Sequence, residues 1–340
     1  MNTNYTVEFA QKILQIDSPS GYTQKIIKYL EDLCTKEDYT FYKNQKGNLI
    51  ISIAGQEDYT LGLSAHVDTL GAMVRSIKSD GTLAFTPIGG PILPTYDGEY
   101  CRVYTRDHKI YTGTFLSNAP AVHVYDNART LPRDDKNMHI RLDEITNSKI
   151  TTQNLGISSG DFIALDPKTV VTEKGFIKSR FLDDKISVAI LFGLLKYLKE
   201  ENITPRYNLK FIISTYEEVG HGASNIPDVD ELIAVDMGCI GLDLNCTEYD
   251  VSICAKDGSG PYDYEITDKL ITLAKELDLN YAVDIYPFYS SDVSAALRGG
   301  NNIKGGLIGP GVSASHGMER THITAVENTL KLLLAYITKC

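Results

Sequence analysis

The chain has 340 residues, of which 43% are hydrophobic and 23% charged, and its formal net charge at pH 7 is −11. This length favours two domains, because a single hydrophobic core stops growing near this size. The acidic balance, without a Lys/Arg cluster or an apolar run long enough to cross a bilayer, argues against nucleic acid or a membrane as a partner.

The first 70 residues contain helix signals followed by strand signals. Apolar residues recur at helical spacing over residues 7–14 and 26–33, with a Ser-Pro-Ser-Gly segment at 18–21 between them. Residues 48–54 and 61–65 are apolar runs typical of buried strands. This order predicts the beginning of an α/β domain.

Residues 71–175 follow a different pattern. Short alternating runs are separated by turn signals such as Ser79-Asp80-Gly81, and no amphipathic helix of useful length stands out. The segment therefore predicts a small β-barrel or β-sandwich.

The alternation of helices and strands resumes after residue 175. Near-continuous apolar strands are predicted between helical stripes, at residues 209–215, 232–235 and 303–308. The simplest architecture is one α/β domain formed by residues 1–70 and 176–340, interrupted by an inserted β domain at residues 71–175.

Histidines and carboxylates follow the ends of the predicted strands. They are His66, Asp68, Glu217, Glu218, Asp236 and His316. In an open α/β sheet, ligands bind beyond the carboxyl ends of the strands. With Asp183, these residues supply two histidines and three carboxylates as metal ligands and one spare carboxylate as a base. A pair of Zn²⁺-like ions and an activated water require such a set.

Each residue also has a simpler interpretation. Asp183 lies at the entrance of a predicted helix, where it or the next aspartate could be an N-cap. An isolated His66 could be an ordinary hydrogen-bonded residue, but Asp68 shares its strand face and could accept its N–H. Adjacent carboxylates at Glu217 and Glu218 could form a solvated turn, yet at the mouth of a buried strand they cost stability unless a cation compensates them. The joint pattern favours a metal site.

With these motifs in this order, the chain resembles the glutamyl-aminopeptidase-like, tetrahedral-aminopeptidase family of co-catalytic metallopeptidases. The resemblance extends over essentially the whole chain, from the Ser-Pro-Ser-Gly segment to His316. It implies a mixed, largely parallel sheet flanked by helices, as in zinc exopeptidases, with a small β-barrel inserted at residues 71–175. It also implies an aminopeptidase that hydrolyses N-terminal residues from short peptides through a metal-bridged hydroxide.

The resemblance assigns the metal ligands residue by residue. His66 and Asp236 would bind one metal ion, Glu218 and His316 the other, and Asp183 would bridge the two. The implied cofactors are two divalent ions per chain, with Zn²⁺ expected and Co²⁺ or Mn²⁺ as alternatives.

Other roles implied by the resemblance lie outside metal coordination. Glu217 would be the general base and Asp68 would orient the first histidine. Asp292 lies in Ser291-Asp292-Val293, which is similar to the family's Thr-Asp-Ala segment near the substrate pocket. The residues around His316 depart from the family's usual Arg-Tyr-x-His-Ser/Thr-Pro-x-Glu setting. His322 therefore competes for the last ligand position and is otherwise a candidate for substrate binding.

The resemblance further implies a homo-oligomer, between a dimer and a dodecamer, with the insert at an oligomer contact or controlling substrate access. The first residues, Met1 to Tyr5, lack the basic and apolar regions of a signal peptide. The six cysteines contain no Cys-x-x-Cys pair and are expected to be reduced thiols. We therefore expect a cytoplasmic location.

Three other functions are compatible with parts of this pattern. An amidase or deacylase acting on N-acyl amino acids or modified small peptides would use the same metals. Related deacylase-type enzymes carry their extra domain later in the chain, however, whereas here the long gap separates His66 from Asp183. A glycosidase would leave the histidines unexplained, and the chain has no Trp for sugar stacking. A non-catalytic protein could keep the metal site for stability alone.

Overall fold

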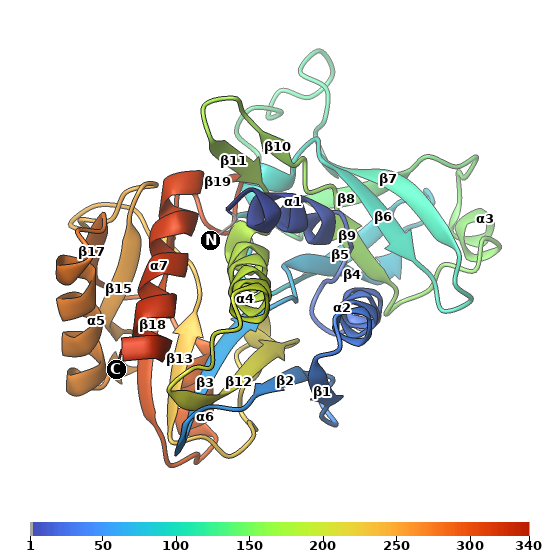
Figure 1. Cartoon of the computed structure of the whole chain (residues 1–340). Helices are drawn as coiled ribbons and strands as arrows, with labels where there is room; N and C mark the ends of the chain where they lie inside the picture. Colours follow the sequence, from blue (N-terminus) through green and yellow to red (C-terminus); the bar gives the residue numbers. More distant parts are fainter. Residues whose placement is uncertain (1–2, 340) are drawn as a thin grey trace. The chain divides into compact units, whose positions relative to one another are not determined.

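The computed structural model describes residues 3–339, and a ten-stranded mixed sheet forms the centre of the first of two units within that range (Figure 1). The path through this sheet is β1 (Thr40–Lys43), β2 (Leu49–Ile53), β12 (Tyr207–Ser214), β3 (Glu57–His66), β13 (Glu231–Val235), β18 (Lys304–Val312), β15 (Val251–Asp257) and β16 (Gly260–Pro261). Off this path, β14 (Gly238–Cys239) pairs with β18, and β17 (Tyr281–Ile285) pairs with β15.

The central strands β12, β3, β13 and β18 run parallel to one another. Antiparallel pairs join β1 to β2, β2 to β12, β15 to β18 and β16 to β15 towards the two edges. All of β13 and the last six residues of β3 are buried. Parallel strands covered on both faces have such continuous burial. The expected mixed, largely parallel sheet is confirmed.

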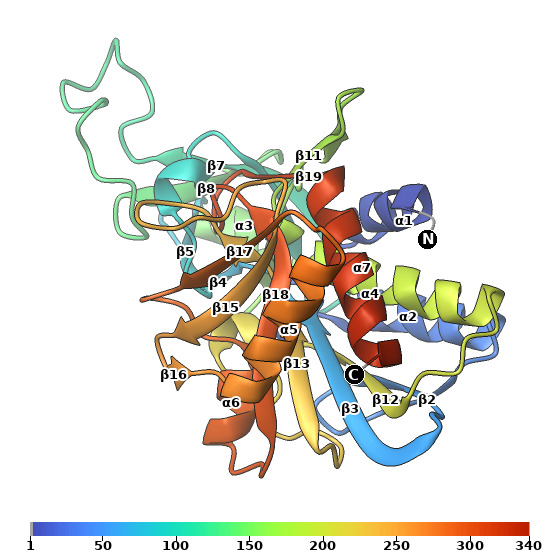
Figure 2. The same cartoon turned by 60° about the vertical axis from the view of Figure 1, so that its left-hand side comes forward.

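Helices cover both faces of this sheet. They are α1 (Thr3–Leu14), α2 (Gln24–Lys36), α4 (Leu182–Glu200), α5 (Tyr264–Glu276), α6 (Asp292–Arg298) and α7 (Ile323–Lys339). Neighbouring Gly305 and Gly306 on β18 point to opposite faces, where a Cβ would collide with Val293 of α6 and Ile266 of α5, respectively. Figure 2 shows α7 beside α5 on one face. Among these described helices, none has the length and apolarity of a membrane span.

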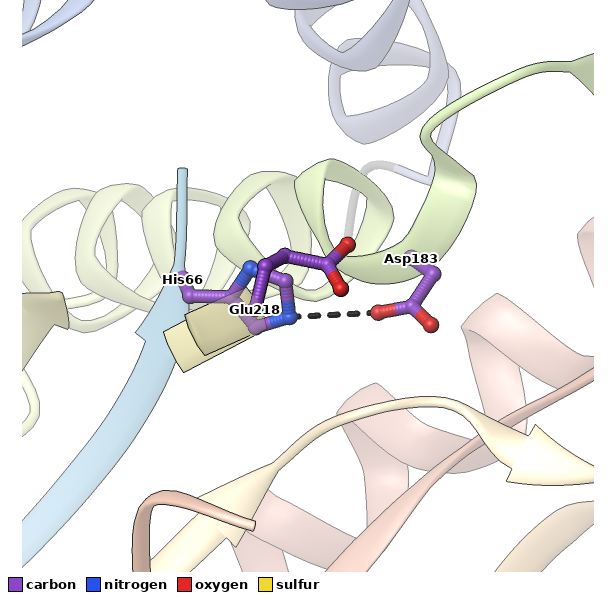
Figure 3. Close-up of side chains that lie close together, drawn as sticks. All are labelled: His66, Asp183 and Glu218. Carbon is purple, nitrogen blue, oxygen red and sulfur yellow. Dashed lines mark hydrogen bonds and ion pairs between the residues drawn. The ribbon is translucent and has the colours of Figure 1, made fainter. Parts of the chain in front are cut away.

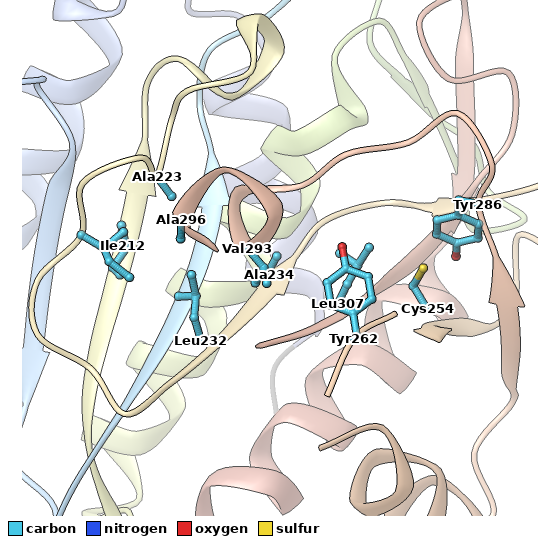
Figure 4. Packing of buried hydrophobic residues seen from close by; sticks show 11 residues of the cluster. Ile212, Ala223, Leu232, Ala234, Cys254, Tyr262, Tyr286, Val293, Ala296 and Leu307 are labelled. Atoms are coloured by element: carbon cyan, nitrogen blue, oxygen red, sulfur yellow. The ribbon is translucent and has the colours of Figure 1, made fainter. Parts of the chain in front are cut away.

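A buried hydrophobic cluster fixes the face of the sheet against α6 (Figure 4). Leu232 and Ala234 of β13 pack there with Leu307 of β18, and Val293 and Ala296 contribute from α6. Because interiors are close-packed, this contact sets where the ends of β13 and β18 lie.

A three-stranded sheet extends the first unit beyond its expected boundary. It consists of β10 (Val170–Val171), β11 (Phe176–Ser179) and β19 (Glu319–His322). The unit boundaries fall after Asp68 and before Lys168, whereas the sequence placed them after residue 70 and before residue 176. Residues 168–175 join the first unit because β10 pairs with β11, which pairs with the distant β19.

The second unit, Thr69–Pro167, is a closed antiparallel barrel. Its strands follow the order β4 (Gly71–Ile77), β5 (Leu83–Ile88), β8 (Met138–Leu142), β7 (Ile110–Ser117), β6 (Tyr100–Tyr104) and β9 (Phe162–Leu165). Phe85 and Phe115 are completely buried and meet edge to face, with ring centroids 4.9 Å apart. The unit also contains a 3₁₀ turn, η1 (Leu93–Tyr96), and the short helix α3 (Lys149–Gln153). The expected β-barrel is confirmed, and the alternative of a sandwich is wrong.

Candidate metal centre

The carboxyl ends of three parallel strands bring predicted site residues to one edge of the sheet. His66 is the last residue of β3 and lies in register with Ser214, the last residue of β12. The acidic pair follows β12 in a 3₁₀ turn, η2 (Glu217–Val219). Asp236 comes directly after β13. The sheet therefore explains why residues so far apart in sequence meet at this edge.

Asp183 lies between the two histidines. Its Oδ1 is 3.1 Å from Nε2 of His66, and its Oδ2 is 3.6 Å from Nε2 of His316. Figure 3 shows the side chains of His66 and Asp183 directed toward each other, with Glu218 beside them. One ligand atom each of His66, Asp183 and Glu218 lies within 4.8 Å of the other two. A carboxylate with one oxygen facing each imidazole has the geometry to bridge two ions, and a helix cap does not account for these contacts.

The acidic pair divides between the same two histidines. Oε2 of Glu217 lies 3.6 Å from Nε2 of His66, and Oε2 of Glu218 lies 3.6 Å from Nε2 of His316. The two glutamates therefore contact different histidines, although a ligand atom of Glu218 also lies within 4.8 Å of one of His66.

Two aspartates complete the half that contains His66. Single ligand atoms of His66, Asp184 and Asp236 lie within 4.8 Å of one another. Asp184 is fully buried, and its Oδ2 accepts the main-chain N–H of His66 at 3.1 Å. Sequence reasoning considered Asp184 only as a helix cap, although its position next to Asp183 was a signal that it could reach the site.

The carboxylate of Asp68 supports the site differently from the sequence prediction. The closest contact of Nδ1 of His66 is the main-chain oxygen of Asp68 at 2.9 Å, while the carboxylate Oδ1 is 3.6 Å away. The carboxylate instead accepts the main-chain N–H groups of Glu217 at 3.1 Å and Glu218 at 3.2 Å, and the hydroxyl of Ser20 at 2.5 Å. The main chain thus orients the histidine, and the carboxylate positions the acidic pair.

Glu319 is a site residue that sequence reasoning missed. It is 2% exposed, and it accepts the main-chain N–H of Asp183 at 3.0 Å and that of His316 at 3.1 Å. His316 has a φ of 63°, a left-handed conformation that non-glycine residues rarely adopt. The carboxylate of Glu319 therefore holds two candidate ligands in place. An acidic residue three positions after His316 was the available signal.

The two residues predicted to bind substrate are not found among the described residues that line the cavity, although Asp292 lies beside the acidic pair. Nε2 of His322 contacts the main-chain oxygen of Lys174 at 2.8 Å, and its ring centroid is 5.0 Å from that of Phe176. Asp292 is 2% exposed, and its Oδ2 accepts the hydroxyl of Ser214 at 2.7 Å. Within residues 3–339, neither side chain is among those that line the cavity. His316, not His322, is the histidine placed next to Asp183.

Burial and mutual interactions shift the pKa values of the residues in this cluster. It raises the pKa of Glu217 and Glu218 well above the usual range, and burial with the nearby Asp183 raises the pKa of Asp236 to about 7. Burial would also raise the pKa of Asp183, but its hydrogen bond with His66 lowers it overall. The pKa of His66 is raised despite burial, because Asp183 and Glu217 stabilise its charged form. Two divalent ions would compensate the same carboxylates once they are ionised.

The donor set fits divalent metal ions. Imidazole nitrogens and carboxylate oxygens are ligands of Zn²⁺, and they also suit Co²⁺ and Mn²⁺. The carboxylates converge on a common space and are largely removed from water, where they repel one another unless a cation is present.

We predict that the stabilising effect of added metal increases with pH. The raised pKa values favour protonated carboxyls in the folded metal-free protein, so its stability falls as pH rises from about 4 to about 7. Ligands must lose their protons to bind metal, so the metal contribution grows over the same window. The test is the difference in Tm between metal-loaded and EDTA-treated protein from about pH 5 to about pH 8. A difference that stays constant or shrinks would contradict this linkage.

A second prediction separates the two C-terminal histidines. His316→Ala should lose about one of the two bound ions per chain, because only His316 faces Asp183 and Glu218. His322→Ala is the matched control and should keep both ions. Metal content after dialysis, measured by mass spectrometry, checks both variants. The opposite pattern would assign the last ligand to His322.

Comparison with known proteins agrees with this geometry. The family model described as M42 glutamyl aminopeptidase matches residues 47–332. A protein of Bacillus subtilis (strain 168), named "Putative aminopeptidase YhfE", is 46% identical over 335 residues, which cover 98% of this chain and 97% of that protein.

Solved structures of peptidases have the same fold. A TET aminopeptidase from a marine sediment archaeon of the Thaumarchaeota aligns with a TM-score of 0.89 at 17% identity, covering 100% of this chain and 97% of that one. The TET1 peptidase of Pyrococcus horikoshii aligns with a TM-score of 0.85 at 22% identity, covering 98% of this chain and 100% of that one. The family match extends over most of the sequence and confirms the resemblance seen in its motifs: the chain belongs to the M42 glutamyl aminopeptidase family.

Proposed function

We propose that this chain is a two-metal aminopeptidase that removes N-terminal residues from short peptides. The observation that carries the proposal is the position of Asp183, with one carboxylate oxygen facing each histidine. Membership of a peptidase family and the aminopeptidase named among its relatives support peptide hydrolysis as the reaction.

The ligand assignment follows the two halves of the site. His66 and Asp236 would hold one ion and Glu218 and His316 the other, with Asp183 shared between them. When bound, the two ions supply Lewis acidity to the scissile carbonyl and lower the pKa of a water molecule. Zn²⁺ is the expected ion, with Co²⁺ and Mn²⁺ as alternatives.

Glu217 is the residue proposed to move the proton. Both glutamates line the cavity, where the carboxylate of Glu217 lies next to Nε2 of His66 and that of Glu218 next to Nε2 of His316. Burial raises the pKa of Glu217, and a raised pKa makes a carboxylate a stronger proton acceptor. It would accept a proton from the attacking water and deliver it to the leaving amine.

Three carboxylates that are not among the residues lining the cavity hold these groups in place. The Asp68 carboxylate fixes the main chain of the acidic pair, and Glu319 fixes that of Asp183 and His316. Asp184 accepts the main-chain N–H of His66. Preorganised groups lower the cost of reaching the transition state, so these carboxylates are positioning residues.

A peptide panel tests this function against the amidase or deacylase alternative. Each sequence is offered to metal-loaded enzyme with a free and with an acetylated N-terminus, and the products are identified by mass spectrometry. We expect stepwise loss of N-terminal residues only from the free-amine set. Cleavage confined to the acetylated set would move the reaction to the deacylase class, with the same metal ligands.

The role of Glu217 predicts a specific loss of turnover. Glu217→Gln should retain both ions and lose at least about a hundredfold in kcat, because an amide cannot accept the proton. Glu218→Gln is the matched control on the neighbouring position and should lose metal as well as activity. Metal content and kcat are measured on the same samples. Full activity in Glu217→Gln would show that Glu217 is not the general base.

Assembly and location remain part of the proposal. The P. horikoshii TET1 peptidase can assemble into a tetrahedron or a large octahedral shell. We propose a homo-oligomer here, with the barrel unit, Thr69–Pro167, forming contacts or controlling access. The five cysteines described in the structure are free, which supports a reducing, cytoplasmic location; Cys340 lies outside the described residues. Light scattering after gel filtration would reject the assembly if the protein were monomeric.

A further inference from the structure

The cavity at the metal centre has two chemically different sides. Its volume is about 420 Å³, and the candidate metal ligands and Glu217 form one side. Most of the remaining lining is apolar, and we call its six residues the apolar wall: Met237, Cys239, Leu244, Tyr286, Pro287 and Phe288. Gly220 and the hydroxyl-bearing residues Tyr289, Ser290 and Ser315 complete the lining. A substrate whose first peptide bond lies at the ligands therefore has an apolar surface available for its N-terminal side chain.

The apolar wall is anchored in the hydrophobic core of the first unit. Tyr286 is 2% exposed and belongs to the buried cluster that also contains Leu307 and Ala234 (Figure 4). Cys239 and Leu244 are partly buried and pack against the same cluster. The hydroxyl of Tyr286 hydrogen-bonds to Ser252, so this polar group already has a partner within the protein. Packing therefore fixes this part of the wall, whereas Pro287 and Phe288 are exposed.

The lining contains no basic residue to pair with an acidic side chain. Among the described residues that line the cavity, none is Lys or Arg. One guanidinium reaches the lining from outside: Nη2 of Arg298 donates to Oγ of Ser290 at 3.0 Å, and its Nη1 donates to Oγ of Ser259 at 2.7 Å. Arg298 is itself exposed to solvent. A glutamyl side chain would have to displace these contacts to form an ion pair.

Charge and apolar burial favour the same class of substrate. A carboxylate or ammonium buried against the apolar wall would lose its hydration without gaining a partner there. An aliphatic or aromatic side chain would gain from leaving water. We propose that the cavity selects peptides whose N-terminal residue is uncharged and apolar, such as leucine, methionine or phenylalanine, over peptides that begin with glutamate or lysine. This inference rests on the proposed aminopeptidase function.

The test is a set of X-Ala-Ala-Ala peptides with free N-termini, where X is Leu, Met, Phe, Glu or Lys. The metal-loaded enzyme should give a kcat/KM for the apolar members at least about tenfold above those for Glu and Lys, since pocket contacts commonly discriminate by tenfold or more. Equal or better cleavage of the Glu or Lys peptide would overturn the inference while leaving the aminopeptidase function intact. Hydrolysis of none of these peptides would instead count against the proposed function itself.

Two matched variants locate the selectivity on the apolar wall. Leu244→Arg places a cation on the wall and should raise the ratio of kcat/KM for the Glu peptide to that for the Leu peptide by at least about tenfold. Leu242→Arg makes the same change two residues away, at a side chain that is 96% exposed and outside the cavity lining, and should leave the ratio unchanged. Metal content and Tm are measured for both variants. An unchanged ratio in metal-replete Leu244→Arg would overturn the assignment of the wall.

Arg298→Ala addresses the external guanidinium. If the apolar wall sets the preference, this variant should keep the wild-type ratio between the Leu and Glu peptides. The inference would be wrong if the wild-type enzyme cleaved the Glu peptide well and Arg298→Ala lost this cleavage. That result would show that Arg298 binds the acidic side chain of the substrate.

Discussion

Mutual repulsion among carboxylates held out of water is the constraint on which this site depends. Asp183, Glu217, Glu218 and Asp236 come from three different connections of the sheet and converge around two imidazoles. In a metal-free cluster, the ion pair of His66 with Asp183 and the protonation of other carboxyls offset this repulsion. The fold must therefore supply enough rigidity to keep like charges together until cations replace the protons.

That rigidity comes from the parallel centre of the sheet. β12, β3 and β13 end at a common edge because their registers align Ser214 with His66 and Ala234 with Ser64. The hydrophobic cluster against α6 locks β13 and β18 in place, and the same cluster supports the apolar wall of the cavity. The ligands and the surface proposed to select the substrate thus share one packed foundation, and a shift of that packing would move both.

The sequence predicted those parts of the fold and the site that follow from a local pattern of apolar and polar residues. Apolar runs that end in His66, in the acidic pair or in Asp236 indicate buried parallel strands, and such strands place their carboxyl ends together. Strand periodicity could not reveal the roles of Asp68 and Glu319. Asp68 binds the main-chain N–H of Glu217, and Glu319 binds that of Asp183, both far away in sequence. Only the contact of Glu319 with the main-chain N–H of His316 is local. The boundary near residue 168 differs from the predicted residue 176 for a related reason, since β11 pairs with the distant β19.

The positioning carboxylates have a consequence for how such a centre can change over evolutionary time. Asp68 and Glu319 hold the backbone of Glu217, Glu218, Asp183 and His316, a group of atoms that almost every amino acid provides. The side chains at these positions could therefore be exchanged while their attachment points remain fixed. Such backbone contacts fix where the ligand positions lie but not which side chains occupy them. Substitutions at these positions can therefore change the metal preference, or end the catalytic activity, while the loops keep their conformation.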